Sequence, residues 1–100
     1  MDEQQIYRLA LEQWGKKAQV FMLFEEMAEL QKVICESTRM NKTILKYDII
    51  QEIIDVEIML GQMKILFNIT GTELRAAKAN KLGKLRKLLD KHKEAKSETR

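Results

Sequence analysis

The amino-acid sequence predicts an all-α fold, and three observations support this prediction. The chain of 100 residues contains no proline and only four glycines, and residues of high helix propensity dominate it. Apolar residues recur at three- and four-residue steps over long stretches, which is the spacing of one buried helix face. The connections between these stretches are short, and short connections favour antiparallel neighbours and hence a four-helix bundle-like fold.

The first two helices are expected on either side of Gly15. One should run from about Glu3 to Trp14 and end near that glycine. The second, from Lys16 to about Glu36, carries a stripe of apolar residues that should face a core: Val20, Leu23, Phe24, Met27, Leu30 and Ile34. Residues 37–42 are rich in polar side chains and are interpreted as a loop.

The third and fourth helices are separated by Asn68 and Gly71. Thr43 is a candidate N-cap for the third helix, which should continue to about Phe67. Residues 70–73 have the S/T-x-x-E form of a capping box, which predicts the start of the fourth helix. That helix should reach Leu89 or a little further.

Size and composition favour one domain over residues 1–92, followed by a polar and frayed tail at 93–100. A domain this small often needs a metal ion or a second copy of itself to be stable. Cys35 is the only cysteine, which excludes an internal disulfide and suits a reducing cytoplasm. No apolar run approaches the length of a membrane span, so a membrane partner is not expected.

Charge is distributed unevenly along the chain. Residues 1–74 carry eight Lys and Arg against twelve Asp and Glu, whereas residues 75–100 carry ten against three. The net charges are therefore −4 and +7, and the two parts are expected to do different electrostatic work.

Four carboxylates occupy positions that a soluble helix would normally fill with apolar residues. The third helix is apolar in nearly every direction and is therefore expected to be buried all round, yet Glu52 and Asp55 share one face of it. Glu26 and Glu29 share a face of the second helix in the same way. Buried carboxylates need a positive partner. No basic residue of this region shares the Glu52/Asp55 stripe, although Lys32 and Lys64 could reach it from elsewhere, and the pattern predicts a hard divalent cation such as Mg²⁺.

A single E-x-x-E pair on a helix is usually a solvated face, since Glu is a good helix former. Two such pairs, each set in an apolar stripe on adjacent helices, are harder to explain in that way. Glu25 is most simply a solvated residue beside the cluster, and Glu57 has no role beyond a contact around the site or at an interface.

Glu25-Glu26-Met27-Ala28-Glu29, followed after 22 residues by Glu52-Ile53-Ile54-Asp55, resembles the E-E-x-x-E … E-x-x-D signature of MazG-like nucleotide pyrophosphohydrolases. These proteins belong to the all-α NTP pyrophosphatase superfamily. The resemblance covers about residues 15–90 and includes Gly15 and Gln19. Each motif alone is weak, but the ordered pair is fairly specific.

The resemblance implies a MazG-like fold completed by oligomerisation, as a homodimer or homotetramer. It implies that Glu26, Glu29, Glu52 and Asp55 bind Mg²⁺, for which Mn²⁺ could substitute. The implied reaction is hydrolysis of a ribo- or deoxyribonucleoside triphosphate to the monophosphate and pyrophosphate, in a nucleotide-pool or house-cleaning role. Glu26 or Glu29 would orient or deprotonate the attacking water.

The basic fourth helix suits a triphosphate substrate, because positive side chains must face the phosphates. Similar proteins place basic and amide residues there, which points to four phosphate-binding candidates: Lys78, Lys81, Arg86 and Asn80. The other lysines of this segment are interpreted as a solvated face. The candidates for contact with the base are Trp14, Phe21 and Met59. Met59 stands where some relatives carry an aromatic residue, and aromatic residues near helical apolar positions, such as Trp14 and Phe21, more often belong to the core.

Three other interpretations compete with hydrolysis. A ferritin-like oxidase would need Glu-x-x-His pairs, and His92, the only histidine, follows neither acidic motif. A basic helical nucleic-acid-binding or interaction protein would use the +7 segment but leaves the acidic pairs unexplained, so a nucleic-acid partner is not expected. A degenerate family member would keep the fold and bind metal without turnover.

Overall fold

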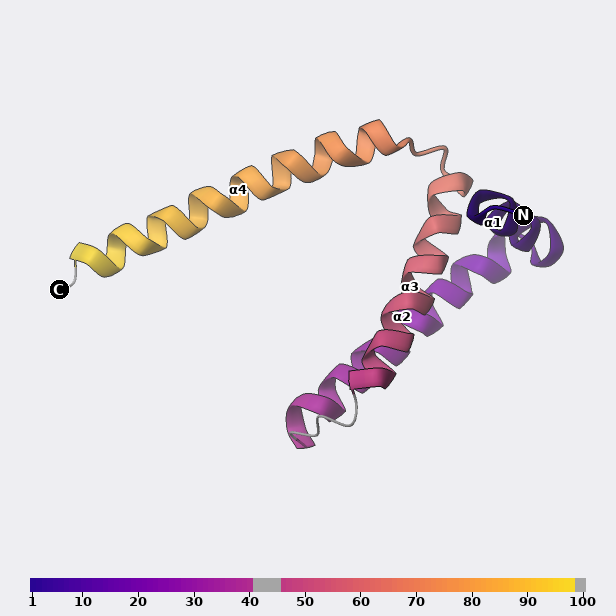
Figure 1. Cartoon of the computed structure of the whole chain (residues 1–100), viewed down its shortest axis with the longest axis horizontal. Helices are drawn as coiled ribbons and strands as arrows, with labels where there is room; N and C mark the ends of the chain where they lie inside the picture. Colours follow the sequence, from indigo (N-terminus) through magenta and orange to yellow (C-terminus); the bar gives the residue numbers. More distant parts are fainter. Residues whose placement is uncertain (41–45, 99–100) are drawn as a thin grey trace. The chain divides into compact units, whose positions relative to one another are not determined.

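The computed structural model describes residues 1–40 and 46–98, which form four α-helices and no β-strand. They are α1 (Glu3–Trp14), α2 (Lys16–Met40), α3 (Lys46–Leu66) and α4 (Gly71–Glu98) (Figure 1). The predicted all-α class is confirmed. Among these helices, none combines the length and hydrophobicity needed to cross a membrane.

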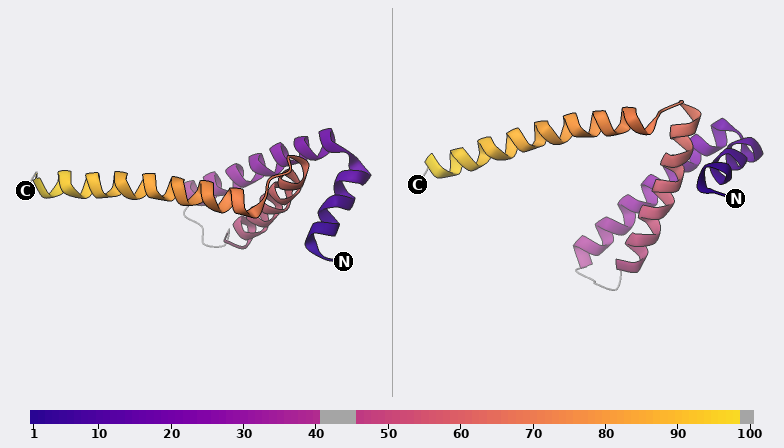
Figure 2. Two further views of the ribbon diagram at one scale, coloured as in Figure 1. Left: turned by 90° about the horizontal axis from the view of Figure 1, so that it is seen from above. Right: turned by 45° about the horizontal axis from the view of Figure 1, so that its top comes forward.

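The chain divides into two compact units, residues 1–68 and 69–100. The first contains α1, α2 and α3, which pack against one another, and the second contains α4. Within the first unit, α2 and α3 lie side by side and run in opposite directions, as Figure 1 and both views of Figure 2 show. The single domain over residues 1–92 and the four-helix bundle stay predictions.

Local sequence signals set the helix ends of the first unit. Asp2 caps α1, because its carboxylate accepts the backbone N–H of Gln5 at 2.8 Å while the Gln5 side chain accepts the N–H of Asp2 at the same distance. Gly15 ends the helix with a φ of 87°, a left-handed conformation that favours glycine, and donates to the carbonyl of Leu11. The predicted break at Gly15 is thus confirmed.

The start of α4 matches the predicted capping box. The backbone N–H of Thr70 donates to Glu73 Oε1 at 2.9 Å, and the N–H of Glu73 donates to Thr70 Oγ1 at 3.1 Å. The Glu73 carboxylate also accepts from the Thr70 hydroxyl at 3.0 Å, and the bonds that it accepts from the backbone N–H and the hydroxyl of Thr70 lower its pKa. Upstream, Asn68 adopts a φ of 55° immediately before the second unit begins, where the sequence predicted a break.

Two helix boundaries differ from the prediction. The loop expected over residues 37–42 is wrong for residues 37–40, which continue α2, where the Thr38 hydroxyl donates to the Ile34 carbonyl one turn earlier. The remainder of that loop and the Thr43 cap lie outside the described residues. Helix α4 continues past Leu89 to Glu98, so the helix covers most of the predicted tail, whose fraying stays a prediction.

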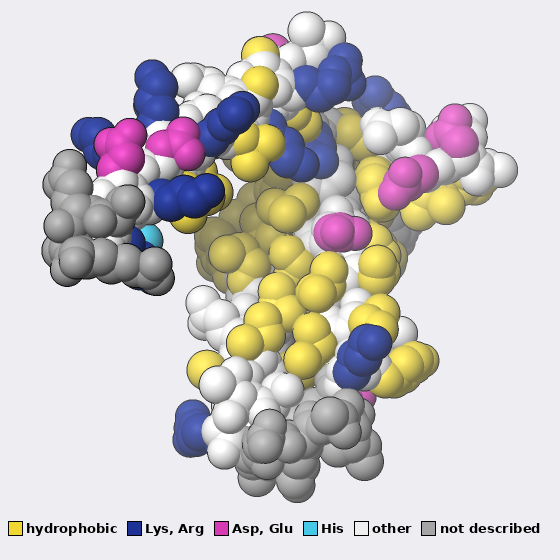
Figure 3. Space-filling view, turned by 60° about the vertical axis from the view of Figure 1, so that its left-hand side comes forward, with side chains coloured by type: hydrophobic (Ala, Val, Ile, Leu, Met, Phe, Trp, Pro, Cys, Tyr) yellow, Lys and Arg dark blue, Asp and Glu magenta, His cyan; other side chains and the backbone are white. Residues whose placement is uncertain are grey.

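Burial of α3 on all sides was also expected, and for the single chain this is wrong. Its buried residues lie near its C-terminal end: Met59, Gly61, Gln62 and Met63. Large apolar side chains elsewhere on the helix remain about two-fifths or more exposed, among them Ile50, Ile53, Ile54 and Leu60. Figure 3 shows hydrophobic side chains gathered over the α2–α3 hairpin, with an acidic group among them.

Tyr7 anchors α1 on α3. Its ring is buried against Gly61, and its hydroxyl donates to Glu3 Oε1 at 2.6 Å. That hydrogen bond, burial and the charges of Glu3 and Glu57 raise the pKa of Tyr7 to about 12. A Cβ at position 61 would lie only 2.9 Å from Tyr7 Cζ, so the close approach requires glycine.

We therefore expect Gly61→Ala to lower the free energy of unfolding by about 2 kcal/mol, because an overpacked core costs roughly 1–3 kcal/mol. Chemical denaturation at fixed protein concentration measures the change. Gly83→Ala in α4 is the matched control, since a Cβ there meets no atom within 4 Å and alanine favours a helix. A Gly61→Ala variant as stable as the parent would contradict this packing.

Candidate metal centre

Three of the four predicted carboxylates meet between α2 and α3. Glu26 comes from α2, and Glu52 and Asp55 lie one turn apart on α3. Each offers one oxygen, and these oxygens all lie within 4.8 Å of one another. Glu26 and Glu52 are half-buried, whereas Asp55 is exposed. The cluster is therefore open to solvent on the Asp55 side.

The charges of this cluster oppose one another. Burial raises the pKa of the Glu26 carboxyl, and the negative charges of Asp55, Glu52, Glu29 and Glu25 raise it further. Glu52 Oε2 is buried and has no hydrogen-bond partner among the described residues. A buried carboxylate oxygen without a donor is costly, and a cation would supply the missing partner. The donor set, three carboxylates, fits a hard divalent cation of the Mg²⁺ class.

Glu29 differs from the other three. Its side chain is exposed and lies outside the group of converging oxygens, although its charge still acts on Glu26. It lies one turn after Glu26 on α2, which keeps it at the edge of the cluster. Its role as a ligand or as the base stays a prediction.

The predicted phosphate-binding residues all lie on α4, in the second unit: Lys78, Asn80, Lys81 and Arg86. Their side chains are exposed, as are the other side chains of this helix from residue 71 to residue 96. They are thus accessible to an anionic ligand, and their contact with phosphate stays a prediction.

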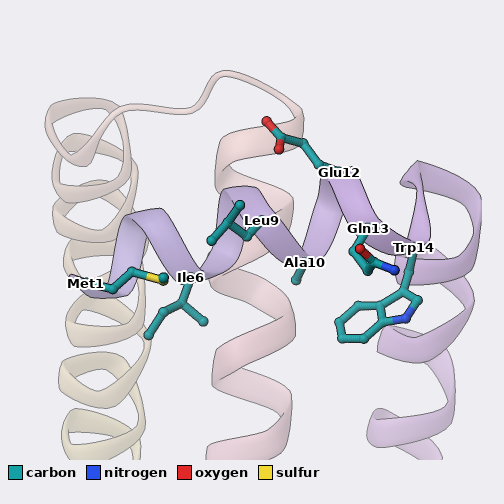
Figure 4. A pocket seen from close by; sticks show the side chains of 7 residues that line it. All are labelled: Met1, Ile6, Leu9, Ala10, Glu12, Gln13 and Trp14. Atoms are coloured by element: carbon teal, nitrogen blue, oxygen red, sulfur yellow. The ribbon is translucent and has the colours of Figure 1, made fainter.

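The three candidates for contact with a base lie in different surroundings. Trp14 is 63% exposed and lines an apolar groove on α1, together with Ile6 and Leu9 (Figure 4). Phe21 is half-exposed and stacks edge to face with Phe24 on α2, with ring centroids 6.2 Å apart. Met59 is buried. Both aromatic rings are therefore open to a ligand, whereas the Met59 side chain is covered.

A buried amide pair also joins α2 and α3, seven residues from Glu26 and Asp55 along the two helices, and it was not predicted from the sequence. Gln19 on α2 donates through Nε2 to Oε1 of Gln62 on α3 at 2.7 Å, and both side chains are buried. Gln62 Nε2 in turn donates to Met59 Sδ at 3.8 Å. The signal was present in the spacing, since Glu52, Asp55, Met59 and Gln62 follow one another at steps of three and four residues on one face.

Comparison of the chain with protein-family models, with curated proteins and with solved structures found no match.

The raised pKa of Glu26 predicts how stability depends on pH. The pKa of Glu26 is higher in the folded protein than in the unfolded chain, where it is near 4.5. At a pH between these two pKa values, Glu26 is therefore protonated more often in the folded protein than in the unfolded chain. We expect the metal-free protein to gain stability as the pH falls from neutral through the folded-state pKa towards the unfolded one. Thermal melting in a chelator at pH 7 and pH 5 measures this gain.

Glu26→Gln should remove part of that pH dependence and raise the melting temperature at pH 7, because it deletes one of the repelling charges. Glu12→Gln, at an exposed position on α1, is the control and should leave the pH dependence as it is. If Glu26→Gln melts with the parent's pH dependence, the carboxylates do not repel one another as described.

Proposed function

We propose that this chain is a MazG-like nucleoside triphosphate pyrophosphohydrolase that depends on Mg²⁺. The observation that supports this proposal best is the convergence of Glu26, Glu52 and Asp55 from two helices, with one buried oxygen of Glu52 left without a donor. These are three of the four residues at which the sequence resembles the family's metal-binding motifs. Hydrolysis of a phosphoric anhydride is the chemistry for which such a site is suited.

The residues of the first unit would hold the cation. Glu26, Glu52 and Asp55 are the proposed ligands, with Glu29 beside them, and Mn²⁺ is the expected substitute for Mg²⁺. A bound divalent ion supplies neutralisation of phosphate charge and lowers the pKa of bound water. The solvent-open side at Asp55 leaves space for water and phosphate oxygens.

The carboxylates and the basic residues of α4 would also act in the hydrolysis step. Water adds across the anhydride bond between the α and β phosphates, which gives the nucleoside monophosphate and pyrophosphate. In this proposal, Glu26 or Glu29 orients that water and takes its proton. The α4 cations Lys78, Lys81 and Arg86, with Asn80, bind the phosphates in this proposal.

The proposed active form is a homodimer or homotetramer. Within the first unit, apolar side chains of α2 and α3 stay about half-exposed, including Phe21, Phe24, Ile50 and Ile54. Contiguous apolar surface of this kind typically marks an interface between proteins. A second copy would cover it, and light scattering should give a mass of two or four chains.

The main test is a panel of ribo- and deoxyribonucleoside triphosphates, with and without Mg²⁺, in which pyrophosphate release is measured. We expect magnesium-dependent release from at least one nucleotide. Asp55→Asn and Glu29→Gln should each reduce the rate at least 100-fold, in line with the loss of a group that acts in general base or metal catalysis.

The control is Glu94→Gln, which removes a carboxylate of the same type from an exposed position on α4. It should retain the parent's rate. Release that persists in a chelator, or that survives Asp55→Asn, would contradict the proposed site. Metal binding without hydrolysis of any nucleotide would instead indicate a degenerate family member.

Nucleic-acid binding is the second candidate, because the exposed basic side chains of α4 could track a phosphate backbone. Salt-sensitive binding of a DNA or RNA duplex that survives Glu52→Gln would support it. We favour hydrolysis, since nucleic-acid binding gives the converging carboxylates no function.

A further inference from the structure

A buried polar contact ties α2 to α3 next to the carboxylate cluster. The side chains of Gln19 and Gln62 are only 5% and 3% exposed, and their hydrogen bond of 2.7 Å spans 43 positions of the sequence. Buried amides are placed where their bonds can be satisfied, because each unpaired group loses its hydration without compensation. The hydrogen bond between the two amides therefore favours one alignment of α2 against α3.

That alignment is the one that assembles the carboxylates. Because α2 and α3 are antiparallel, a step forward on one helix is matched by a step back on the other. Seven residues on from Gln19 is Glu26, and seven residues back from Gln62 is Asp55. Seven residues are two helical turns, about 10 Å, so the amide pair and the carboxylates lie in the same seam.

The residues between these two layers define the alignment poorly. Met59 occupies the intervening layer on α3, and the half-buried Leu23 lies between Gln19 and Glu26 on α2, so the contacts of this layer are apolar and without direction. Methionine is unbranched and adapts to different neighbours, so it tolerates a shift of one helix along the other. The carboxylates themselves favour a shift, because like charges repel.

We propose that Gln19 and Gln62 are positioning residues, which fix the register of α2 against α3 and so bring Glu26 opposite Asp55 and Glu52 before a cation binds. The metal-binding part of this inference rests on the proposed function. A shift of one turn would place Gln19 opposite Met59 or Leu66 and break the bond between Gln19 Nε2 and Gln62 Oε1. A buried polar pair that fixes helix register is well known from coiled coils.

The test replaces both amides with methionine, which has nearly the same size and shape and suits a helix. In Gln19→Met/Gln62→Met the methionine side chains keep the space between α2 and α3 filled, but the hydrogen bond that fixes the register is removed. The matched control is Gln31→Met/Gln51→Met, which changes one exposed glutamine on each of the same helices.

The first readout is a distance between spin labels, which does not depend on metal. One label is attached to Cys35 on α2, the only cysteine of the chain, and the other to Lys64→Cys near the end of α3; both positions are exposed. A one-turn slip changes their separation by about 5 Å. Labelled chains are diluted with unlabelled ones, so that distances within one chain are measured.

We expect a single distance in the parent and in the control, and a shifted or bimodal distribution in Gln19→Met/Gln62→Met. The second readout is a Mn²⁺ titration, in which the double variant should bind at least tenfold more weakly than the control. An unchanged single distance in the double variant would overturn the proposal. A shifted distance with undiminished Mn²⁺ affinity would overturn its claim that register assembles the cluster.

The two proposals fail in different ways. If the parent binds no Mn²⁺ but the double variant still shifts the label distance, the proposed metal function is wrong and the register role stands. If the double variant does not fold, Gln19→Asn gives the second test, since it keeps an amide but shortens its reach by one methylene. A single parent-like distance in that variant would also count against the register role.

Discussion

The structure of the first unit depends on a conflict between packing and charge. The α2–α3 seam holds three carboxylates with oxygens within 4.8 Å of one another, and part of Glu52 is buried without a donor. Each ionised carboxylate makes ionisation of the next less favourable, which is why the pKa of Glu26 is raised. Without a cation, the site stores unfavourable electrostatic energy that the rest of the seam must offset.

The contacts that offset this energy lie at the end of the α2–α3 hairpin where α1 packs. The Gln19–Gln62 bond and the packing of Tyr7 on Gly61 are both on the side of α3 towards its C-terminus, where its buried residues are found. The carboxylates lie further along the seam, where side chains become more exposed. A well-packed end thus supports a more exposed segment in which like charges lie close together.

The structural features that could be predicted from the sequence are those set by residues close to one another along the chain. Gly15 and the Thr70–Glu73 box act within one turn, so the ends they set were confirmed. Residues 37–40 were misassigned because polar composition was taken as a loop, although these residues continue the helix. The carboxylate spacing predicted that Glu26, Glu52 and Asp55 lie close together. It could not predict that the Glu29 side chain is exposed and outside the converging oxygens, because this depends on the rotation of α2 about its axis.

The apolar surface of the hairpin and its acidic seam are physically related. If a second copy covers the exposed side chains of α2 and α3, water is removed from around Glu26 and Glu52 and the local dielectric constant falls. Repulsion among the carboxylates then rises, and so does their attraction for a cation. In the proposed oligomer, the repulsion among the carboxylates would couple assembly to metal binding. Each of the two equilibria would then change the affinity of the other by the same factor.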